Sequence, residues 1–367
     1  MNPFNPNFGR MPQLFLDRDQ IVQDYVTEIN EGFDTPVQTT VIYGVRGAGK
    51  TALLTDICNQ LQQNDWLVIN LIGNDDILAS LVSQLYHAVT PPLQRAFNHL
   101  QGMQIVHIGV SFTQETTGTT AEYQTLLMTM LRKVADHHMR VMLVIDEVKS
   151  TQSMRTFASL YQLLIRENLP VALIMTGLPE NISELQNNSV LTFLLRSHRI
   201  ELQPLNPTVM IQSFAQKFKE GKRQVNMTVL NSITALTRGY AYAFQLIGYL
   251  IWKHTQPGDV IDEQLIEELL PEYQLGLSRN AYTKIYQDLS EHDRLFIRAM
   301  AAEPTAKVKM KQIQERTHKP ANYLSNYRQR LLASQIIRSA GYGYVAFTLP
   351  QFKEFVQWYG AYDDAGF

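Results

Sequence analysis

The chain has 367 residues, enough for two or three domains of roughly 100–200 residues each. Its hydrophobic share of 45% and charged share of 18% exclude a disordered chain and are typical of a globular protein. No apolar run approaches the roughly 20 residues that cross a bilayer, and the single cysteine, Cys58, cannot form an internal disulfide. We therefore expect a cytoplasmic protein with no membrane partner.

The net charge of −2 is unevenly distributed along the chain. Residues 291–360 hold eleven lysines and arginines against five acidic residues, a net charge of +6, so the rest of the chain carries −8. A basic C-terminal module on an acidic body is typical of a protein that contacts nucleic acid. Solvated surface lysines alone produce a smaller version of the same bias.

Residues 1–14 contain three prolines and several asparagines, which predict an extended arm. Apolar stretches at helix and strand spacing then alternate along the chain. The expected helices are 19–29, 50–64, 75–88, 121–138 and 151–167, and the expected strands are 39–43, 66–72, 141–145 and 171–175, with a further strand or hairpin at 104–112. Apolar strands separated by helices predict an α/β fold, the parallel sheet of a P-loop NTPase with helices on both faces.

The sequence GVRGAGKT at residues 44–51 fits the phosphate-binding pattern GxxxxGK[ST]. In this pattern backbone N–H groups surround the phosphates, Lys50 contacts the terminal phosphates as a catalytic residue, and Thr51 offers its hydroxyl to Mg²⁺. The motif follows an apolar strand and opens a helix, which distinguishes it from an ordinary glycine-rich turn. The expected nucleotide-binding residues are Gly44, Val45, Arg46, Gly47, Ala48, Gly49, Lys50, Thr51 and Ala52.

Two carboxylates, Asp146 and Glu147, follow the apolar strand 141–145. Ligands of such sheets bind at the carboxyl ends of the strands, so both side chains are expected beside the phosphate-binding loop. Asp146 would hold Mg²⁺, directly or through water, and Glu147 would act as the general base for the attacking water. Alternatively, the two acids only end the strand and cap a helix.

Three further residues are candidates for catalysis. Thr176 ends the next apolar strand and would orient the attacking water, although a threonine there also fits ordinary strand propensity. Arg196, ahead of Arg199, would stabilise the transition state at the γ-phosphate of a neighbouring protomer. Surface ion pairing, for example with Glu201, is the other explanation for the two arginines.

The chain beyond Pro204 is helical in pattern, with expected helices at 207–222, 228–237 and 241–254. Three helices and a hairpin then predict a winged helix, at 291–301, 309–317, 320–334, 335–338 and 344–349. The expected domains are an arm at 1–14, a P-loop core at 15–205, a helical lid and linker at 206–288, and a winged helix at 289–367.

The third helix of the winged helix would present polar residues to the bases and phosphates of double-stranded DNA. The expected DNA-contacting residues are Lys319, Asn322, Ser325, Asn326, Arg328, Arg330 and Tyr342. Winged helices also bind proteins, so a protein partner is the alternative.

In this order the pieces resemble the AAA+ ATPases of the origin-recognition-like and archaeal-ATPase group, which combine a P-loop core, a helical lid and a C-terminal winged helix. NPF at 2–4 with FLDRD at 15–19 resembles the N-terminal motif of the group, with Asp17 where glycine is usual. Residues 191–205 resemble its arginine-containing strand, and TRGYAY at 237–242 resembles its Gly-Tyr-Pro-Tyr turn. No arginine follows that turn, where many relatives carry one that senses the nucleotide.

The motifs and the resemblance together predict a protein that binds ATP or ADP with Mg²⁺ and hydrolyses ATP slowly. Its nucleotide state would control how the winged helix meets DNA. Self-association would supply an arginine in trans. The rival hypothesis is a signalling or scaffold switch whose ATPase core gates contacts with another protein, and a third is a protein that holds a nucleotide without turning it over.

Overall fold

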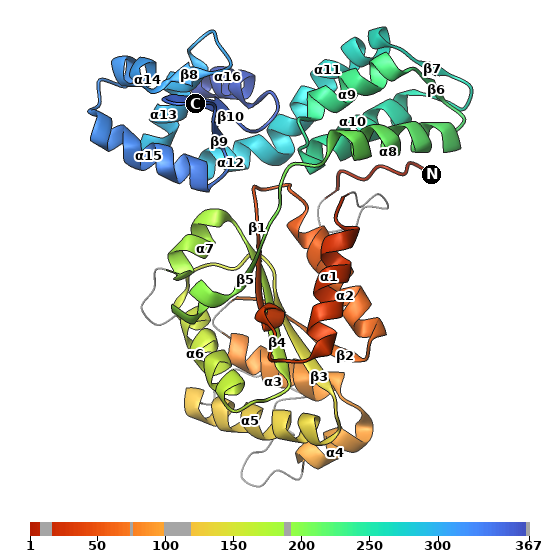
Figure 1. Ribbon diagram of the computed structural model, residues 1–367, viewed down its shortest axis with the longest axis vertical. Coiled ribbons are helices and arrows are strands. Elements are labelled where there is room, and N and C mark those ends of the chain that lie inside the picture. The colour runs from red at the N-terminus through yellow and green to blue at the C-terminus, as the bar shows by residue number, and fades with distance from the viewer. Residues whose placement is uncertain (8–16, 74–75, 99–118, 187–191, 365–367) are drawn as a thin grey trace. The chain divides into compact units, whose positions relative to one another are not determined.

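The computed structural model describes residues 1–7, 17–73, 76–98, 119–186 and 192–364 (Figure 1). The chain divides into two compact units, and each has its own hydrophobic core. The sheet unit comprises residues 20–43 and 53–201, and the helical unit comprises residues 1–19, 44–52 and 202–367. No helix in these described ranges is long and apolar enough to cross a membrane.

The sheet unit is built on a five-stranded parallel sheet in the order β2-β3-β4-β1-β5. Its strands are β1 (Thr39–Tyr43), β2 (Trp66–Leu71), β3 (Arg140–Ile145), β4 (Val171–Gly177) and β5 (His198–Glu201). β3 and β4 are apolar and buried along nearly their whole length. Such strands occur where helices cover both faces of a parallel sheet, and the predicted α/β P-loop fold is therefore confirmed.

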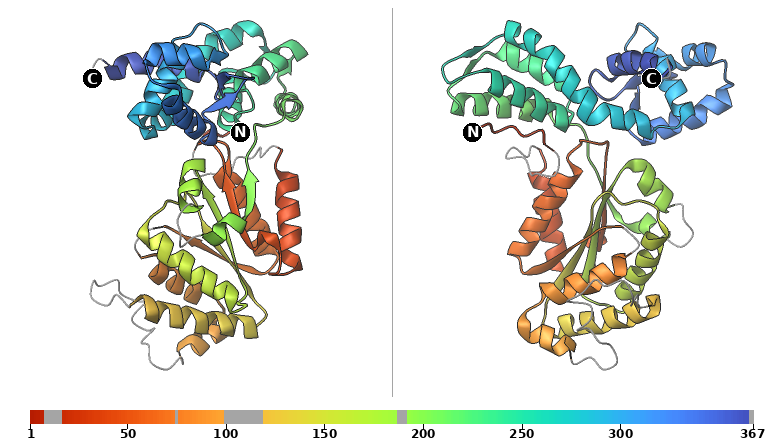
Figure 2. Two further views of the ribbon diagram at one scale, coloured as in Figure 1. Left: turned by 60° about the vertical axis from the view of Figure 1, so that its left-hand side comes forward. Right: turned by 180° about the vertical axis from the view of Figure 1, so that it is seen from behind.

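Helices flank this sheet, with α1 and α2 on one side and α6 and α7 on the other in Figure 1 and in the view from behind in Figure 2. The helices are α1 (Asp19–Glu31), α2 (Lys50–Gln63), α3 (Ile77–Ala88), α4 (Pro91–Asn98), α5 (Thr120–Asp136), α6 (Gln152–Arg166) and α7 (Pro179–Gln186). The described residues of this unit also form two 3-10 helices, η1 (Pro36–Gln38) and η3 (Thr192–Arg196). Helices α4 and α7 were not predicted, and the strand or hairpin expected at 104–112 lies outside the described residues.

The lid of the helical unit consists of four helices and a short parallel pair of strands. They are α8 (Pro207–Glu220), β6 (Gln224–Val225), α9 (Met227–Thr237), α10 (Ala241–His254), β7 (Val260–Ile261) and α11 (Glu263–Leu277). Side-chain oxygens of Asn206, Asn226 and Asp262 accept backbone N–H groups at the starts of α8, α9 and α11. Helix α10 is buried around most of its circumference and forms the centre of the lid.

The N-terminal arm is anchored in this lid by Phe4, which is 1% exposed. The centroid of its ring lies 5.7 Å from the ring centroids of Phe214, Phe218 and Phe244. Gly248 of α10 makes room for the ring, because a Cβ at this position would clash with it. Hydrogen bonds from Asn2 and Asn5, on either side of Phe4, join this part of the arm to α10, so residues 2–5 pack as part of the lid.

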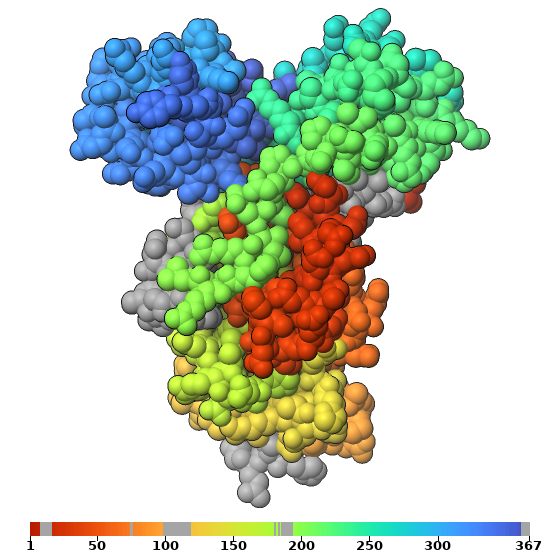
Figure 3. Space-filling view, viewed as in Figure 1, coloured from red at the N-terminus to blue at the C-terminus, as the bar shows by residue number. Residues whose placement is uncertain are grey.

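A C-terminal module follows the lid along one helical path, in which the π-helical turn η4 (Ser278–Tyr282) separates α11 from α12 (Thr283–Asp288). The module contains α13 (Glu291–Ala301), β8 (Val308–Lys309), α14 (Met310–Thr317), α15 (Ala321–Ala333), β9 (Ile337–Ser339), β10 (Tyr344–Phe347) and α16 (Phe352–Asp364). Its sheet is antiparallel in the order β8-β10-β9. The three helices and the hairpin that were predicted here follow one another in the expected order, whereas β8 and α16 were not predicted. In Figure 3 the lid is green to teal and the module is blue.

Replacing Gly248 by alanine should destabilise the lid by about 1–3 kcal/mol, because the added methyl group overpacks the Phe4 ring. In a Phe4→Ala background the same substitution should cost much less, since the ring that it strikes is gone. Urea unfolding of the wild type, both single variants and the double variant measures this coupling. Equal costs of Gly248→Ala in the two backgrounds would contradict the anchoring of the arm.

Candidate functional site

The glycine-rich loop begins at Gly44, directly after β1, and ends where Lys50 opens α2. Gly47 and Gly49 have φ angles of +79° and +96°, in the left-handed region that side chains rarely adopt. Lys50 is 8% exposed, and its ammonium group donates to the carbonyl oxygens of Gly44 at 2.9 Å and Val45 at 3.0 Å. The loop therefore folds around its lysine, and a bound phosphate would compete with these carbonyls for the ammonium group.

Two tyrosines of the lid donate hydrogen bonds to carbonyl oxygens of this loop within the helical unit. The hydroxyl of Tyr240 donates to the carbonyl oxygen of Arg46 at 2.7 Å. The backbone N–H of Tyr242 donates to the carbonyl oxygen of Gly47 at 3.1 Å. A Cβ on Gly47 would clash with the Tyr240 ring and hydroxyl, so glycine is required here by close approach as well as by its φ angle.

The acidic motif lies at the carboxyl end of β3, where Asp146 and Glu147 are both exposed. Thr176, near the end of the neighbouring strand β4, is fully buried and donates its hydroxyl hydrogen to the Asp146 carboxylate. The backbone N–H of Glu147 donates to the Thr176 hydroxyl at 3.0 Å and to Asp146 Oδ1 at 3.1 Å. Glu147 has a φ angle of +51°, uncommon for a residue other than glycine, and these hydrogen bonds hold it there.

Strands β1, β4 and β3 are parallel neighbours, with Tyr43 of β1 in register with Gly177 of β4. The peptide that leaves β1 toward the glycine-rich loop therefore starts at the sheet edge that carries Asp146, Glu147 and Thr176, which we call the Asp146 cluster. This is the edge where ligands of α/β sheets bind. Burial, and secondarily the Asp146 carboxylate, raise the pKa of the Cys58 thiol in α2 to about 12, so the thiol stays protonated and behaves as a small apolar group.

The structure does not bring Arg196 and Arg199 to this edge. Arg196 ends η3 just before β5 begins, so it lies at the amino end of the parallel strands. Arg199 is in register with Val41, in the middle of β1. Both arginines are exposed, and their catalytic roles stay predictions.

The residues expected to contact DNA differ in exposure. Those exposed on α15 and on the β9–β10 hairpin are Asn322, Ser325, Asn326, Arg330 and Tyr342. Lys319 and Arg328 are half-buried. The guanidinium group of Arg330 pairs at 2.9 Å with Asp293, whose side chain is only 3% exposed. Removing Arg330 would leave the buried carboxylate of Asp293 without the positive charge that compensates it. This arginine therefore has a structural role in joining α15 to α13.

Gln335, between α15 and β9, also contacts the glycine-rich loop and was not predicted. Its side-chain oxygen accepts the backbone N–H of Val45 at 3.2 Å, although the two residues are 290 positions apart. No local pattern signals a contact over this distance. From the sequence, Tyr240 and Tyr242 were included only as members of the turn at residues 237–242. Gly239, directly before Tyr240, was the sequence feature that indicated close packing at this turn.

Two segments of the chain match known domain families. Residues 36–185 match the AAA domain family, and residues 279–356 match a domain of unknown function. A comparison with curated proteins gives no match. The match to the AAA domain family spans both the glycine-rich loop and the acidic motif.

Solved structures agree over nearly the whole chain. A Walker-type ATPase of Pyrococcus abyssi aligns with a TM-score of 0.62 at 15% identity, covering 95% of this chain and 97% of that one. The ORC2 protein of Aeropyrum pernix, solved as ADPNP-ADP complexes, aligns with a TM-score of 0.62 at 12% identity over 98% of each chain. Its ADP form gives 0.50 at 13% identity, over 96% of this chain and 97% of that one. The chain thus has the fold of these solved proteins.

Replacing Thr176 by valine should slow nucleotide hydrolysis by roughly 10- to 100-fold, because it removes the hydroxyl that holds both Asp146 and the Glu147 N–H. Thr176→Ser keeps a hydroxyl and should retain most of the turnover. Phosphate release at saturating ATP measures the effect, and melting temperatures check that both variants fold. Wild-type turnover in the valine variant would show that the hydroxyl does not organise the carboxylates.

Proposed function

We propose that the protein is an ATPase that binds ATP with Mg²⁺ through residues 44–52 and the carboxylates at the end of β3. The observation that carries this proposal is the Asp146 cluster, ordered by Thr176, at the sheet edge where β1 passes into the glycine-rich loop. The AAA domain match at residues 36–185 supports it. So does the likeness to the ORC2 protein of Aeropyrum pernix, whose solved complexes contain ADPNP and ADP.

The roles follow from the chemistry of each group. Lys50 would contact the terminal phosphates, while the Thr51 hydroxyl and the Asp146 carboxylate are oxygen ligands of the kind that Mg²⁺ prefers. Thr51 and Asp146 are exposed residues, so a Mg²⁺ ion held by them could keep water molecules among its ligands. Glu147 would polarise the attacking water as general base. An arginine supplied by a second protomer, Arg196 or Arg199, would complete the site.

Lys50→Ala should weaken ATP binding at least about 100-fold, because the group that contacts the terminal phosphates is lost. Glu147→Gln should bind ATP normally and lose roughly 100-fold or more in turnover, since only the general base is removed. Calorimetry measures binding and phosphate release measures turnover, with Lys149→Gln, an exposed lysine beside the acidic motif, as the control. The proposal fails if the wild type binds no ATP and Lys50→Ala changes nothing. Unchanged turnover in Glu147→Gln would refute the role of this residue.

We further propose that α13 to β10 form a winged helix that binds double-stranded DNA under control of the nucleotide state. Residues 291–360 carry a net charge of +6, and polar residues are exposed along α15. Tyr342, at the tip of the hairpin, is fully exposed. A signalling or scaffold role with a protein partner is the second candidate, because Arg330 and Arg328 are partly used in packing within the module.

Neutralising Lys319 and Arg328 with glutamine should flatten the salt dependence of DNA affinity. The slope of log K against log salt should fall by about one for each phosphate contact removed. Arg330 stays intact in this test because it compensates the buried Asp293. Fluorescence anisotropy with a labelled duplex measures the slopes, and Lys219→Gln on the exposed side of α8 is the control. Absence of DNA binding even at low salt would favour the protein partner.

A further inference from the structure

Tyr240 contacts the glycine-rich loop with its hydroxyl group. Its ring contacts Tyr282 in η4, the helical turn that leads from the lid to the C-terminal module. The residue is 5% exposed, and burial raises the pKa of its hydroxyl, which therefore stays protonated and donates to the Arg46 carbonyl at 2.7 Å. Its ring stacks on that of Tyr282 at a centroid distance of 6.4 Å and an interplanar angle of 22°. One side chain thus joins the loop to an aromatic cluster.

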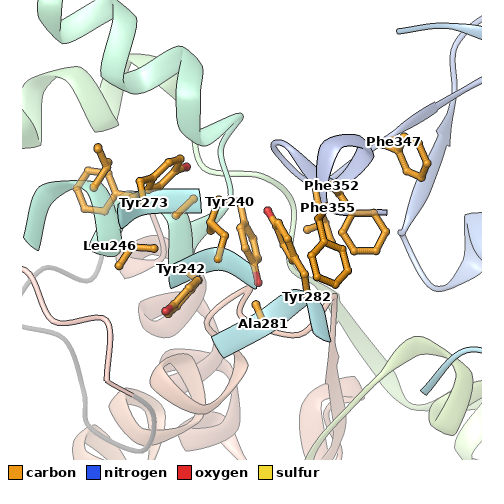
Figure 4. Packing of buried hydrophobic residues seen from close by; sticks show 14 of the residues in the cluster. Tyr240, Tyr242, Leu246, Tyr273, Ala281, Tyr282, Phe347, Phe352 and Phe355 are labelled. Atoms are coloured by element: carbon orange, nitrogen blue, oxygen red, sulfur yellow. The ribbon is translucent and has the colours of Figure 1, made fainter. Parts of the chain in front are cut away.

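The cluster continues from Tyr282 into the C-terminal module. The ring of Tyr282 meets Phe352 at 5.0 Å and Phe355 at 5.6 Å, both from α16, in edge-on contacts. Figure 4 shows the rings of Tyr240, Tyr282, Phe352 and Phe355 next to one another. Tyr282 lies in the π-helical turn η4, and such turns inside helices are frequently found at functional sites.

A second contact reaches the same part of the loop from the end of α15, through the Gln335 side chain and the Val45 N–H. Residues 45–47 of the loop are therefore held by groups from the lid and from the C-terminal module. All of these contacts lie inside the helical unit. These contacts reach the loop at residues 45–47, whereas the Lys50 ammonium group donates to the carbonyl oxygens of Gly44 and Val45.

Two of these groups, the Tyr240 hydroxyl and the Tyr242 N–H, hold carbonyl oxygens of the loop, whereas Gln335 accepts an N–H. A P-loop directs backbone N–H groups inward to the phosphates, so carbonyl groups on its outer side need other partners. The Tyr240 hydroxyl and the Tyr242 N–H are those partners for Arg46 and Gly47. Removing the Tyr240 hydroxyl would leave the Arg46 carbonyl without this donor.

We propose that Tyr240 is a positioning residue, which fixes the glycine-rich loop for phosphate binding and couples nucleotide binding to α16 through Tyr282. The inference rests on the proposed binding of ATP or ADP. Since coupling between two sites is reciprocal, a nucleotide that orders the loop stabilises the packing of α16, and that packing in turn favours the nucleotide.

Tyr240→Phe tests the first half of the proposal, because it removes the hydroxyl and keeps the ring. The dissociation constant for ADP should rise about fivefold, the usual effect of one lost hydrogen bond. The matched control is Tyr273→Phe, another buried tyrosine of the same hydrophobic core, whose hydroxyl donates at 3.2 Å to the Leu236 carbonyl and not to the loop. ADP affinity should be unchanged in this control.

Hydrogen exchange at saturating ADP tests the second half. In the wild type, ADP should slow exchange in the loop 44–52 and in the peptides 278–288 and 352–364. In Tyr240→Phe, saturated with ADP, the loop should still be protected while the gain in α16 is lost. A residue with only a structural role would not separate the two responses, because its loss would affect the peptides with and without ADP alike.

The outcomes distinguish this inference from the proposed function. If ADP does not bind the wild type, the proposed function itself fails. If ADP binds both the wild type and Tyr240→Phe with equal affinity and protects α16 equally, the inference is overturned and the function stands. Equal weakening of ADP binding by Tyr240→Phe and Tyr273→Phe would also overturn it, since Tyr240 would then act only through the stability of the core.

Discussion

The contact between the lid and the glycine-rich loop depends on hydrogen bonds to two carbonyl groups of the loop, those of Arg46 and Gly47. A loop that turns its N–H groups toward phosphates has carbonyl groups on its other side, and unpaired buried carbonyls are costly. Here the donors come from the start of α10: the hydroxyl of Tyr240, its N-cap residue, and the backbone N–H of Tyr242. The lid is thereby tied to residues 46 and 47, and the aromatic core that surrounds Tyr240 extends the tie to α16.

At the carboxyl edge of the sheet, hydrogen bonds of Thr176 order the two acidic residues Asp146 and Glu147. Thr176 is buried and uses both functions of its hydroxyl, as a donor to Asp146 and as an acceptor for the Glu147 N–H. The left-handed backbone of Glu147 is sustained by this network. A threonine at this position therefore does more than satisfy strand propensity, since valine, with similar shape, has neither hydrogen-bonding function.

Local sequence patterns were enough to predict most of the fold. The bounds of β1, α10 and α13 coincide with those expected from apolar periodicity, because each element buries a stripe or face that its own residues define. The glycine-rich loop and the acidic motif were found for the same reason, as short motifs next to apolar strands. The anchoring of Phe4 in the lid and the contact of Gln335 with Val45 were not found, because both depend on packing between segments more than 200 residues apart.

Packing within the C-terminal module changes the ratio of basic to acidic groups that remain unpaired by buried ion pairs. Two of the five acidic residues between residues 291 and 360, Asp293 and Glu303, are nearly buried and are paired with Arg330 and Arg316. In each pair the two charges neutralise one another, and the pairs secure α15 to the first turn of α13 and α14 to the residues after α13. The remaining basic residues then outnumber the remaining acidic ones by nine to three. The module therefore presents to solvent a charge that is more one-sided than its composition alone indicates, which is the electrostatic property that attraction of a polyanion requires.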